Sequence, residues 1–258
     1  MAALDEVVRF LDQELRTGEI PDYEAALNGL QLSNSGNVSR VAAAVDFSTA
    51  TVAGALKARA DLLVVHHGMF WGGAERIIGP VFERLRMAMD GGLAVYSSHL
   101  PLDVHPSLGN NALFARELNL EPSGTFGRYK TIEIGVSGSA AAVATADLFA
   151  RVREYSSRYS TAAVCTSNDK SRRTHHWAIV TGAGASSDTL REAVERGIDT
   201  LIVGEGPHHT AVQAADAGIT VLYLGHYASE TLGVIALATE LGRRFGIRSS
   251  FIEAPSGL

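Results

Sequence analysis

The sequence contains one cysteine, Cys165, so the chain has no internal disulfide to stabilise it. Its fold must therefore rest on the burial of apolar side chains. Hydrophobic residues make up 46% of the 258 positions, which is enough for one large domain or two modest ones. A chain without disulfides also suits a reducing compartment, and we expect a cytoplasmic protein.

Long apolar runs and a basic surplus are missing as well. No run approaches the ~18 to 20 apolar residues that span a bilayer, and residues 1–15 lack the basic-then-apolar pattern of a signal peptide. The 22 Lys and Arg are outnumbered by 28 Asp and Glu, giving a net charge of −6. Sequence-independent binding to nucleic acid or to an anionic membrane needs a basic surface, so both partners are disfavoured. Small molecules or other proteins are the expected partners.

What the sequence does have is a repeated alternation of short apolar strands and helices. Strands and helices alternate as β-α-β-α-β twice, first over residues 40–98 and again over 177–224. Strands that are apolar on both faces are typical of parallel sheets covered by helices. We therefore predict an α/β fold of two partly similar domains with mostly parallel sheets.

The two halves align with a constant offset. Residues 40–68 align without gaps on residues 178–206, an offset of 138 at both ends, and "ADLLVVHHG" and "IDTLIVGEG" share Asp, Leu, Val and Gly. Related units and the general similarity of α/β sequences both explain this match. We predict a first α/β unit at 1–124, a connecting or decorating segment at 125–175 with a helix over 141–155, and a second unit at 176–258.

Polar residues gather at the ends of the predicted strands, where ligands of parallel α/β proteins bind. Seven of the nine histidines follow four strand ends, and only His175 and His176 lie elsewhere. The strand-end residues with metal-binding or acid-base side chains are His66, His67, His99, Asp103, His105, Glu205, His208, His209, His226 and Glu230.

Clustered imidazoles and carboxylates are typical of a divalent zinc, manganese, iron, cobalt or nickel site. Neighbouring side chains at a strand end diverge, so His66 and His67 suit two adjacent ions better than one. The spacing of four between His226 and Glu230 places both on one face of a helix that starts there. A carboxylate can bridge two ions, an arrangement that hydrolases use.

Each residue also has a structural alternative. Asp103 is placed to cap the helix that "NNALFARELNL" predicts, and Glu230 fits an exposed helix position. The imidazoles His99, His105, His208 and His209 fit either substrate-facing or purely structural roles. His175 and His176 lie beside arginines and are typical of a solvated surface.

Several motifs together resemble the GTP cyclohydrolase I type 2 homologue family, the dinuclear-metal proteins related to an NGG-interacting factor. They are "NGLQL", "VVHHGMFW", "SHLPLDVHPSLGNNA", "GEGPHH" and "GHYASE". The resemblance implies that His67 and Asp103 hold one metal ion, His66 and His226 hold the other, and Glu230 bridges both. It also implies two intertwined α/β domains and a toroidal homohexamer.

The family name implies a cyclohydrolase, yet the sequence has no guanine-specific or Walker-type motif. We hypothesise a metal-dependent hydrolase of a nucleotide or small phosphorylated compound, with His99 or His209 moving protons. The alternative is a non-enzymatic, metal-dependent binding or adaptor protein. The apolar "MFWGG" loop beside the expected ligands indicates an interface, a substrate wall, or rings folded back on their own domain.

Overall fold

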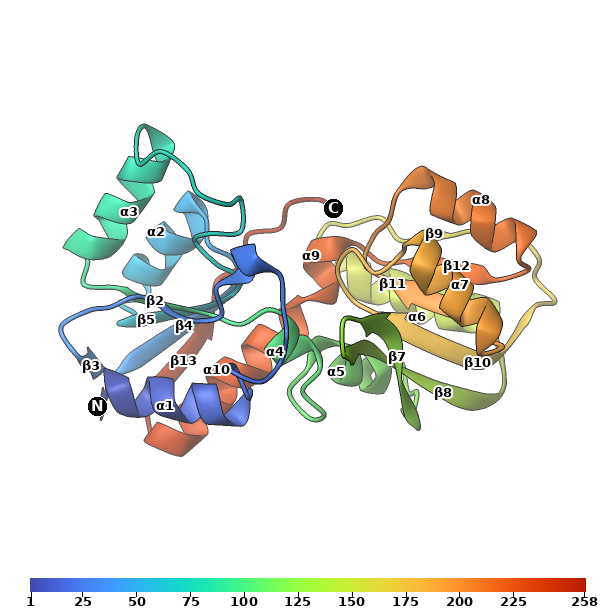
Figure 1. Ribbon diagram of the computed structural model, residues 1–258, viewed down its shortest axis with the longest axis horizontal. Coiled ribbons are helices and arrows are strands. Elements are labelled where there is room, and N and C mark those ends of the chain that lie inside the picture. Colours follow the sequence, from blue (N-terminus) through green and yellow to red (C-terminus); the bar gives the residue numbers. More distant parts are fainter. The chain divides into compact units, whose positions relative to one another are not determined.

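A computed structural model describes residues 1–258, and the chain divides into two compact units (Figure 1). Unit 1 comprises residues 1–102 and 233–254, and unit 2 comprises residues 103–232 and 255–258. Both units are thus discontinuous in sequence, whereas the predicted segments 1–124, 125–175 and 176–258 follow the order of the motifs along the chain.

Unit 1 is built on a five-stranded sheet in the order β13-β4-β5-β6-β2. The strands β13, β4, β5 and β6 run parallel, and β2 pairs antiparallel with β6. Its strands and helices are β1 (Ala2–Ala3), α1 (Leu4–Glu14), η1 (Glu24–Ala26), β2 (Gly29–Leu32), β3 (Asn37–Val38), β4 (Arg40–Asp46), α2 (Thr49–Lys57), β5 (Leu62–His67), α3 (Pro80–Asp90), β6 (Ala94–Ser97) and β13 (Arg248–Phe251).

The unit boundaries at 102/103 and 232/233 fall inside two helices, α4 (Leu100–Asp103) and α10 (Thr231–Phe245). No helix of the chain combines the length and the apolar character needed to cross a bilayer.

Unit 2 is built on a six-stranded sheet in the order β7-β8-β10-β11-β12-β9. Only β10, β11 and β12 are parallel neighbours, and the remaining pairings are antiparallel. Its elements are α5 (Asn110–Glu117), β7 (Gly124–Tyr129), β8 (Ile132–Ala144), α6 (Thr145–Ser157), β9 (Val164–Cys165), β10 (Arg173–Val180), α7 (Ser187–Glu195), β11 (Thr200–Val203), α8 (His208–Asp216), β12 (Thr220–Tyr223) and α9 (His226–Ser229).

The α/β fold is confirmed, but the prediction of mostly parallel sheets needs correction because both sheets are mixed. The repeated β-α-β-α-β stretches supply the parallel strands β4, β5 and β6 in unit 1 and β10, β11 and β12 in unit 2, as expected. In unit 1 the C-terminal strand β13 adds a further parallel strand from outside the repeat. The antiparallel strands come from outside those stretches, namely β2 in unit 1 and β7, β8 and β9 in unit 2. These three strands of unit 2 lie almost entirely within the predicted connecting segment, residues 125–175, and they form half of the unit 2 sheet.

The helix predicted over 141–155 begins four residues later. Residues up to Ala144 stay in β8, where Val143 and Ala144 pair with the start of β10 across a register shift. Pairing with a neighbouring strand therefore overrides the helical propensity of the alanine run, which is a weak preference for each residue.

The offset of 138 appears in the elements themselves. Helices α2 and α7 each have nine residues and start at Thr49 and Ser187, which are 138 positions apart. Their N-caps, Ser48 and Ser186, follow the same offset, and each side chain accepts a hydrogen bond from the backbone N–H three residues on. Such caps satisfy an N–H that the helix leaves without a partner.

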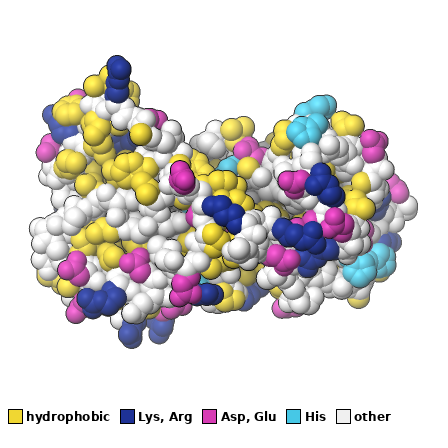
Figure 2. All heavy atoms as spheres, viewed as in Figure 1, with side chains coloured by type: hydrophobic (Ala, Val, Ile, Leu, Met, Phe, Trp, Pro, Cys, Tyr) yellow, Lys and Arg dark blue, Asp and Glu magenta, His cyan; other side chains and the backbone are white.

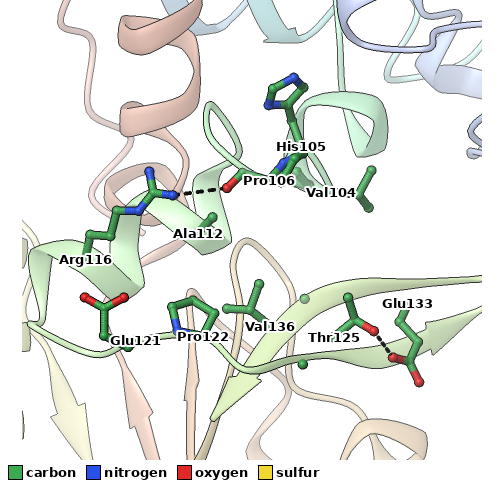
Figure 3. Close-up of a pocket in the computed structure, with 13 residues that line it drawn as sticks. Val104, His105, Pro106, Ala112, Arg116, Glu121, Pro122, Thr125, Glu133 and Val136 are labelled. Carbon is green, nitrogen blue, oxygen red and sulfur yellow. Dashed lines mark hydrogen bonds between the residues drawn. The ribbon is translucent and has the colours of Figure 1, made fainter.

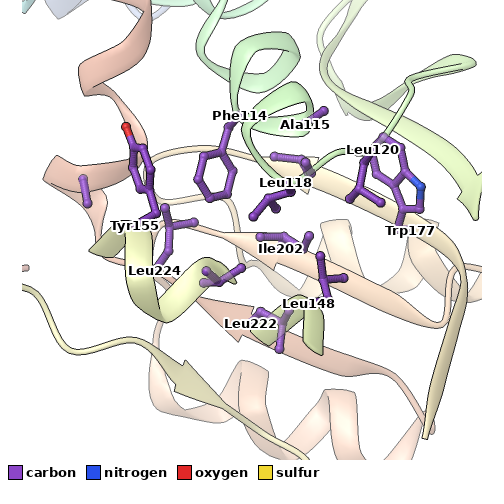
Figure 4. Close-up of a cluster of buried hydrophobic side chains, with 13 residues drawn as sticks. Phe114, Ala115, Leu118, Leu120, Leu148, Tyr155, Trp177, Ile202, Leu222 and Leu224 are labelled. Carbon is purple, nitrogen blue, oxygen red and sulfur yellow. The ribbon is translucent and has the colours of Figure 1, made fainter. Parts of the chain in front are cut away.

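Each sheet carries its own apolar core. In unit 1, one face of the sheet packs against α2 and α3 through residues such as Leu63, Val65 and Val52, which are fully buried. In unit 2, α5 and α6 cover one sheet face, where Phe114, Trp177 and their neighbours interlock (Figure 4). These cores hold the strand ends, and therefore the site residues, in place.

Candidate metal centre

Three imidazoles of unit 1 lie together at the carboxyl ends of two neighbouring strands. His66 and His67 end β5, and His99 follows β6, which pairs in parallel with β5. The His66 ring centroid lies 4.8 Å from those of both His67 and His99. One ligand atom from each of the three lies within 4.8 Å of the others, and all three residues are buried.

Hydrogen bonds at Nδ1 fix which nitrogen each imidazole offers. His66 Nδ1 lies 2.9 Å from the carbonyl oxygen of Ser98. Because a carbonyl oxygen only accepts, Nδ1 carries the proton and Nε2 keeps the lone pair. His67 and His99 have carboxylates in the same place, at 2.9 Å from Asp46 and Asp22. Metal-binding histidines are oriented in this way, so the donor chemistry of this cluster fits a divalent ion bound through Nε2.

Asp22 anchors His99 within a partly buried hydrogen-bond network. Its carboxylate accepts from the backbone N–H groups of Tyr23 and Leu100 and from the Asn28 side chain, besides His99. Asn28 also accepts from the backbone N–H of His99. Burial works to raise the pKa of Asp22, but the bonds and charge of His99 and the bond from Asn28 outweigh it, so the pKa lies below its usual range. Asp22 thus stays ionised and keeps the His99 ring in one orientation.

Unit 2 contributes an imidazole between two carboxylates. His226 starts α9, and Glu230 follows its last residue, so the spacing of four brings His226 Nε2 within 3.2 Å of a Glu230 carboxylate oxygen. His226 Nδ1 lies 2.9 Å from Glu205. Glu230 is only 2% exposed, so the alternative of an exposed helix residue is wrong. The predicted shared face is confirmed.

The two carboxylates change the protonation of His226. Burial lowers its pKa, but hydrogen bonds and charge from Glu230 and then Glu205 more than compensate and raise it to about 10. A metal ion that binds His226 therefore has to displace a tightly held proton, since only neutral imidazole is a ligand.

Asp103 belongs to unit 2 and is buried. One of its carboxylate oxygens accepts from the Asn110 side-chain amide at 2.9 Å and from the Thr181 hydroxyl at 3.4 Å. The alternative of a helix cap is wrong, because the N-cap of α5 is Gly109. These two donors hold the Asp103 carboxylate in a fixed position, as expected of a ligand oxygen.

Gly182 makes room for Glu230. Its φ is +62°, and a Cβ at this position would lie 2.2 Å from a Glu230 carboxylate oxygen. Its backbone N–H donates to Ser229 Oγ at 2.8 Å. Both the conformation and the close approach need glycine here, so the "TGAGASS" turn leaves the space that the Glu230 carboxylate occupies.

The remaining histidines lie outside these clusters. His209 and His208 are exposed in the first turn of α8, and His175 and His176 are exposed on β10, as the surface alternative predicts. His105 Nδ1 accepts from the backbone N–H of Leu108 at 3.0 Å, which gives this imidazole a structural role in its turn.

A cavity of about 340 Å³ opens in unit 2 between α5 and the β7–β8 hairpin (Figure 3). Arg116 spans its rim and donates to the carbonyl of Pro106 at 3.3 Å. In Figure 3 the imidazole of His105 points away from Arg116 and Glu121. Asp103 lines the cavity, but the imidazoles that carry the metal-binding chemistry do not.

Two carboxylates that hold imidazoles, Asp46 and Asp22, are not among the predicted site residues. A signal was available for Asp46, because it ends β4 and pairs in register with His67 across the parallel strands. Asp22 lies 77 residues from His99 in a loop without periodicity, and no sequence pattern connects them.

Known proteins resemble this chain over nearly its whole length. The GTP cyclohydrolase 1 type 2 homolog of Deinococcus radiodurans is 39% identical over 256 residues, which cover 98% of this chain and 94% of the relative. That of Archaeoglobus fulgidus is 38% identical and covers 99% of both.

Solved structures agree. TTHA1606 from Thermus thermophilus is 32% identical with a TM-score of 0.84, and protein ybgI, described as of unknown function, is 27% identical with a TM-score of 0.88. Both cover 100% of each chain. The family description DUF34/NIF3 (NGG1p interacting factor 3) matches residues 2–256. The resemblance found in the sequence motifs is thus confirmed, and this chain belongs to the DUF34/NIF3 family.

Proposed function

We propose that the chain binds two divalent metal ions per subunit and acts as a metal-dependent hydrolase. In this proposal His67 and Asp103 hold one ion, His66 and His226 hold the other, and Glu230 bridges both. The observation that carries it is the pairing of every imidazole concerned at Nδ1, with a carbonyl for His66 and carboxylates for His67 and His226. A hydrogen bond at Nδ1 fixes the orientation of the ring and leaves Nε2 as the nitrogen that can bind a metal ion.

The donor set is of nitrogen and carboxylate oxygen, which accommodates zinc, manganese, iron, cobalt or nickel. A divalent ion supplies hydrolytic chemistry by lowering the pKa of coordinated water to about 7. The chain's own residues then have to orient the substrate and move protons. We assign the proton transfer to His99, because Asp22 holds it beside His66 and His67. His209, the other candidate, has an exposed side chain that favours this role less.

The substrate in this proposal is a nucleotide or another small phosphorylated compound, in line with the names of the relatives. The test is a panel of nucleoside mono-, di- and triphosphates and simple phosphoesters, assayed with protein loaded with each metal. We expect turnover of at least one compound that is lost in His66→Ala and reduced in His99→Gln. Absence of turnover across the panel with two ions bound would contradict the hydrolase and favour the non-enzymatic alternative.

We further propose that the chain associates with itself as a closed ring of six. Support comes from an apolar surface on unit 1 formed by Ile77, Ile78, Phe82 and Met89, which are 46–64% exposed. Figure 2 shows hydrophobic side chains gathered over α3 and its surroundings. Of the α3 residues only Ala88 is buried, so this helix leaves much apolar area to cover.

Light scattering during size exclusion tests the ring. A mass about six times the 27.3 kDa chain is expected, and Phe82→Glu should lower it. A mass of one chain would contradict self-association and leave the apolar surface for another protein, as in the adaptor alternative.

A further inference from the structure

The loop after β5 returns one aromatic ring onto the unit 1 imidazoles. Gln31, from the "NGLQL" motif, accepts a hydrogen bond from the backbone N–H of Met69 at 2.6 Å. The Gln31 side chain in turn donates to the carbonyls of Ala26 and Leu27. Gly68 lies so close to Gln31 that a Cβ there would be 2.3 Å from it. The loop is therefore anchored at its first residues, and Trp71 has a defined position.

Trp71 lies directly against two imidazoles. Its ring centroid is 4.6 Å from that of His67 and 4.4 Å from that of His99. Tyr23 approaches the indole edge-on at 6.2 Å and lies 5.8 Å from His99. Trp71 nevertheless remains 37% exposed, so the imidazoles cover only part of the indole. The indole is therefore an aromatic group that a ligand can still contact beside the imidazole cluster.

We propose that Trp71 is a stacking residue for a planar nitrogen heterocycle, the base of a nucleotide substrate. This inference rests on the proposed function and narrows its substrate class from phosphorylated compounds in general to those that carry an aromatic base. A molecule that reaches the imidazoles from this side meets the indole. Every nucleobase has a π face that stacks on an aromatic ring, whereas a sugar phosphate has none.

The "NGLQL" motif has a role in this arrangement. Its Asn28 holds the backbone of His99, and its Gln31 holds the loop that carries Trp71. The same short segment therefore positions both the proposed proton carrier and the proposed stacking ring. Stacking of one base on an aromatic side chain changes affinity by about 5- to 150-fold in alanine substitutions.

The chain offers a direct spectroscopic readout because it has two tryptophans. Trp177 is fully buried in unit 2, so an added nucleotide that stacks on the protein surface reaches Trp71 alone. Guanosine 5′-monophosphate and ribose 5-phosphate are titrated into the metal-loaded full chain while tryptophan emission is recorded. We expect saturable quenching by the nucleotide, none by the sugar phosphate, and loss of the quenching in Trp71→Phe.

Calorimetry with the same two compounds gives the affinities. Trp71→Ala should weaken nucleotide binding by about 5- to 150-fold. Trp71→Phe should retain most of the affinity, and Val194→Ala, a change at an exposed apolar residue of α7 in unit 2, should leave it unchanged. Metal content measured on the same samples separates the two proposals. The stacking role would be overturned, and the hydrolase left intact, if the protein held two ions but bound sugar phosphate and nucleotide equally well. Full nucleotide affinity in Trp71→Ala would have the same consequence. Nucleotide stacking on Trp71 in a protein that holds no metal would overturn the metal-dependent hydrolase and leave the stacking role intact.

Discussion

The two units share a scaffold but differ in the residues at their strand ends. Helices α2 and α7, their serine caps and the strands that follow them keep a constant offset of 138. At the end of β5 unit 1 has His66 and His67, whereas the aligned positions of unit 2 are Gly204 and Glu205. The repeated backbone thus decides where site residues lie, and the residue types at those positions decide what each unit can do.

The difference is one of charge. Unit 1 presents three imidazoles whose Nδ1 atoms are hydrogen-bonded to one carbonyl and two carboxylates. Unit 2 places carboxylates on both sides of its single clustered imidazole, His226. Unit 1 therefore offers mainly nitrogen donors, whereas unit 2 offers carboxylate oxygen on both sides of a nitrogen donor.

The largest effect is expected from the carboxylate that we propose to be shared. Glu230→Gln keeps the size of the side chain but removes its charge, so the binding of both ions should be weakened. Asp103→Asn should weaken the binding of mainly one ion. Metal content of desalted protein, measured by mass spectrometry, should fall from two equivalents towards none in Glu230→Gln and towards one in Asp103→Asn. Glu195→Gln, an exposed residue paired with Arg128, is the control. Retention of two equivalents in Glu230→Gln would refute the bridge.

The carboxylates behind the imidazoles allow a matched comparison of the units. Asp46→Asn acts behind His67 in unit 1, and Glu205→Gln acts behind His226 in unit 2. Loss of such an outer partner lowers metal affinity by about 10- to 100-fold. Competition titrations with a zinc chelator should show a decrease of metal affinity in this range for each variant. The ion that is bound more weakly should be a different one in the two variants. Unchanged affinities would show that the Nδ1 partners do not prepare the ligands.

A smaller effect is expected in the pH dependence of stability after metal has been stripped with a chelator. The pKa of His226 is raised from 6.5 to about 10 in the folded chain, so its charge contributes stability that is fully present below pH ~6.5. That contribution is lost as the pH rises through about 10.

His226→Asn should therefore lower the melting temperature at pH 6.5 and flatten its decline towards pH 10. His209→Asn, a change at an exposed imidazole of the same unit, should leave the curve unaltered. A decline of equal slope in His226→Asn and the parent chain would contradict this assignment.

The smallest effect concerns the shared scaffold. Ser48→Ala and Ser186→Ala each remove an N-cap, at a typical cost of about 0.5–2 kcal/mol. The Ser48 change should cost less, because Thr51 Oγ1 still accepts from the backbone N–H of residue 48. Urea unfolding measures both against Ser35→Ala, an exposed loop position. A larger loss of stability in Ser48→Ala than in Ser186→Ala would contradict this ranking.

Much of the fold was predictable because it depends on local patterns. Buried parallel strands such as β5 are apolar throughout, and their alternation with helices fixes the β-α-β units. The spacing of four between His226 and Glu230 also correctly placed them together. These features need only residues within one strand, one helix or one repeat.

The remainder depends on contacts between distant segments. No local pattern shows with which neighbours β2, β7, β8 and β9 pair, or that β8 extends into the alanine run. The partnership of Asp22 with His99 joins a loop to a strand end 77 residues away. Such pairings are set by strand order and loop packing, which periodicity does not encode.

The proposed dinuclear metal centre can be tested directly by a crystal structure of zinc-loaded protein with anomalous data collected at the zinc absorption edge. We expect two anomalous peaks per chain, with Nε2 of His66, His67 and His226 as ligands and Glu230 in contact with both ions. Anomalous density bound through Nδ1 of these histidines, or no density at their Nε2 atoms, would contradict it.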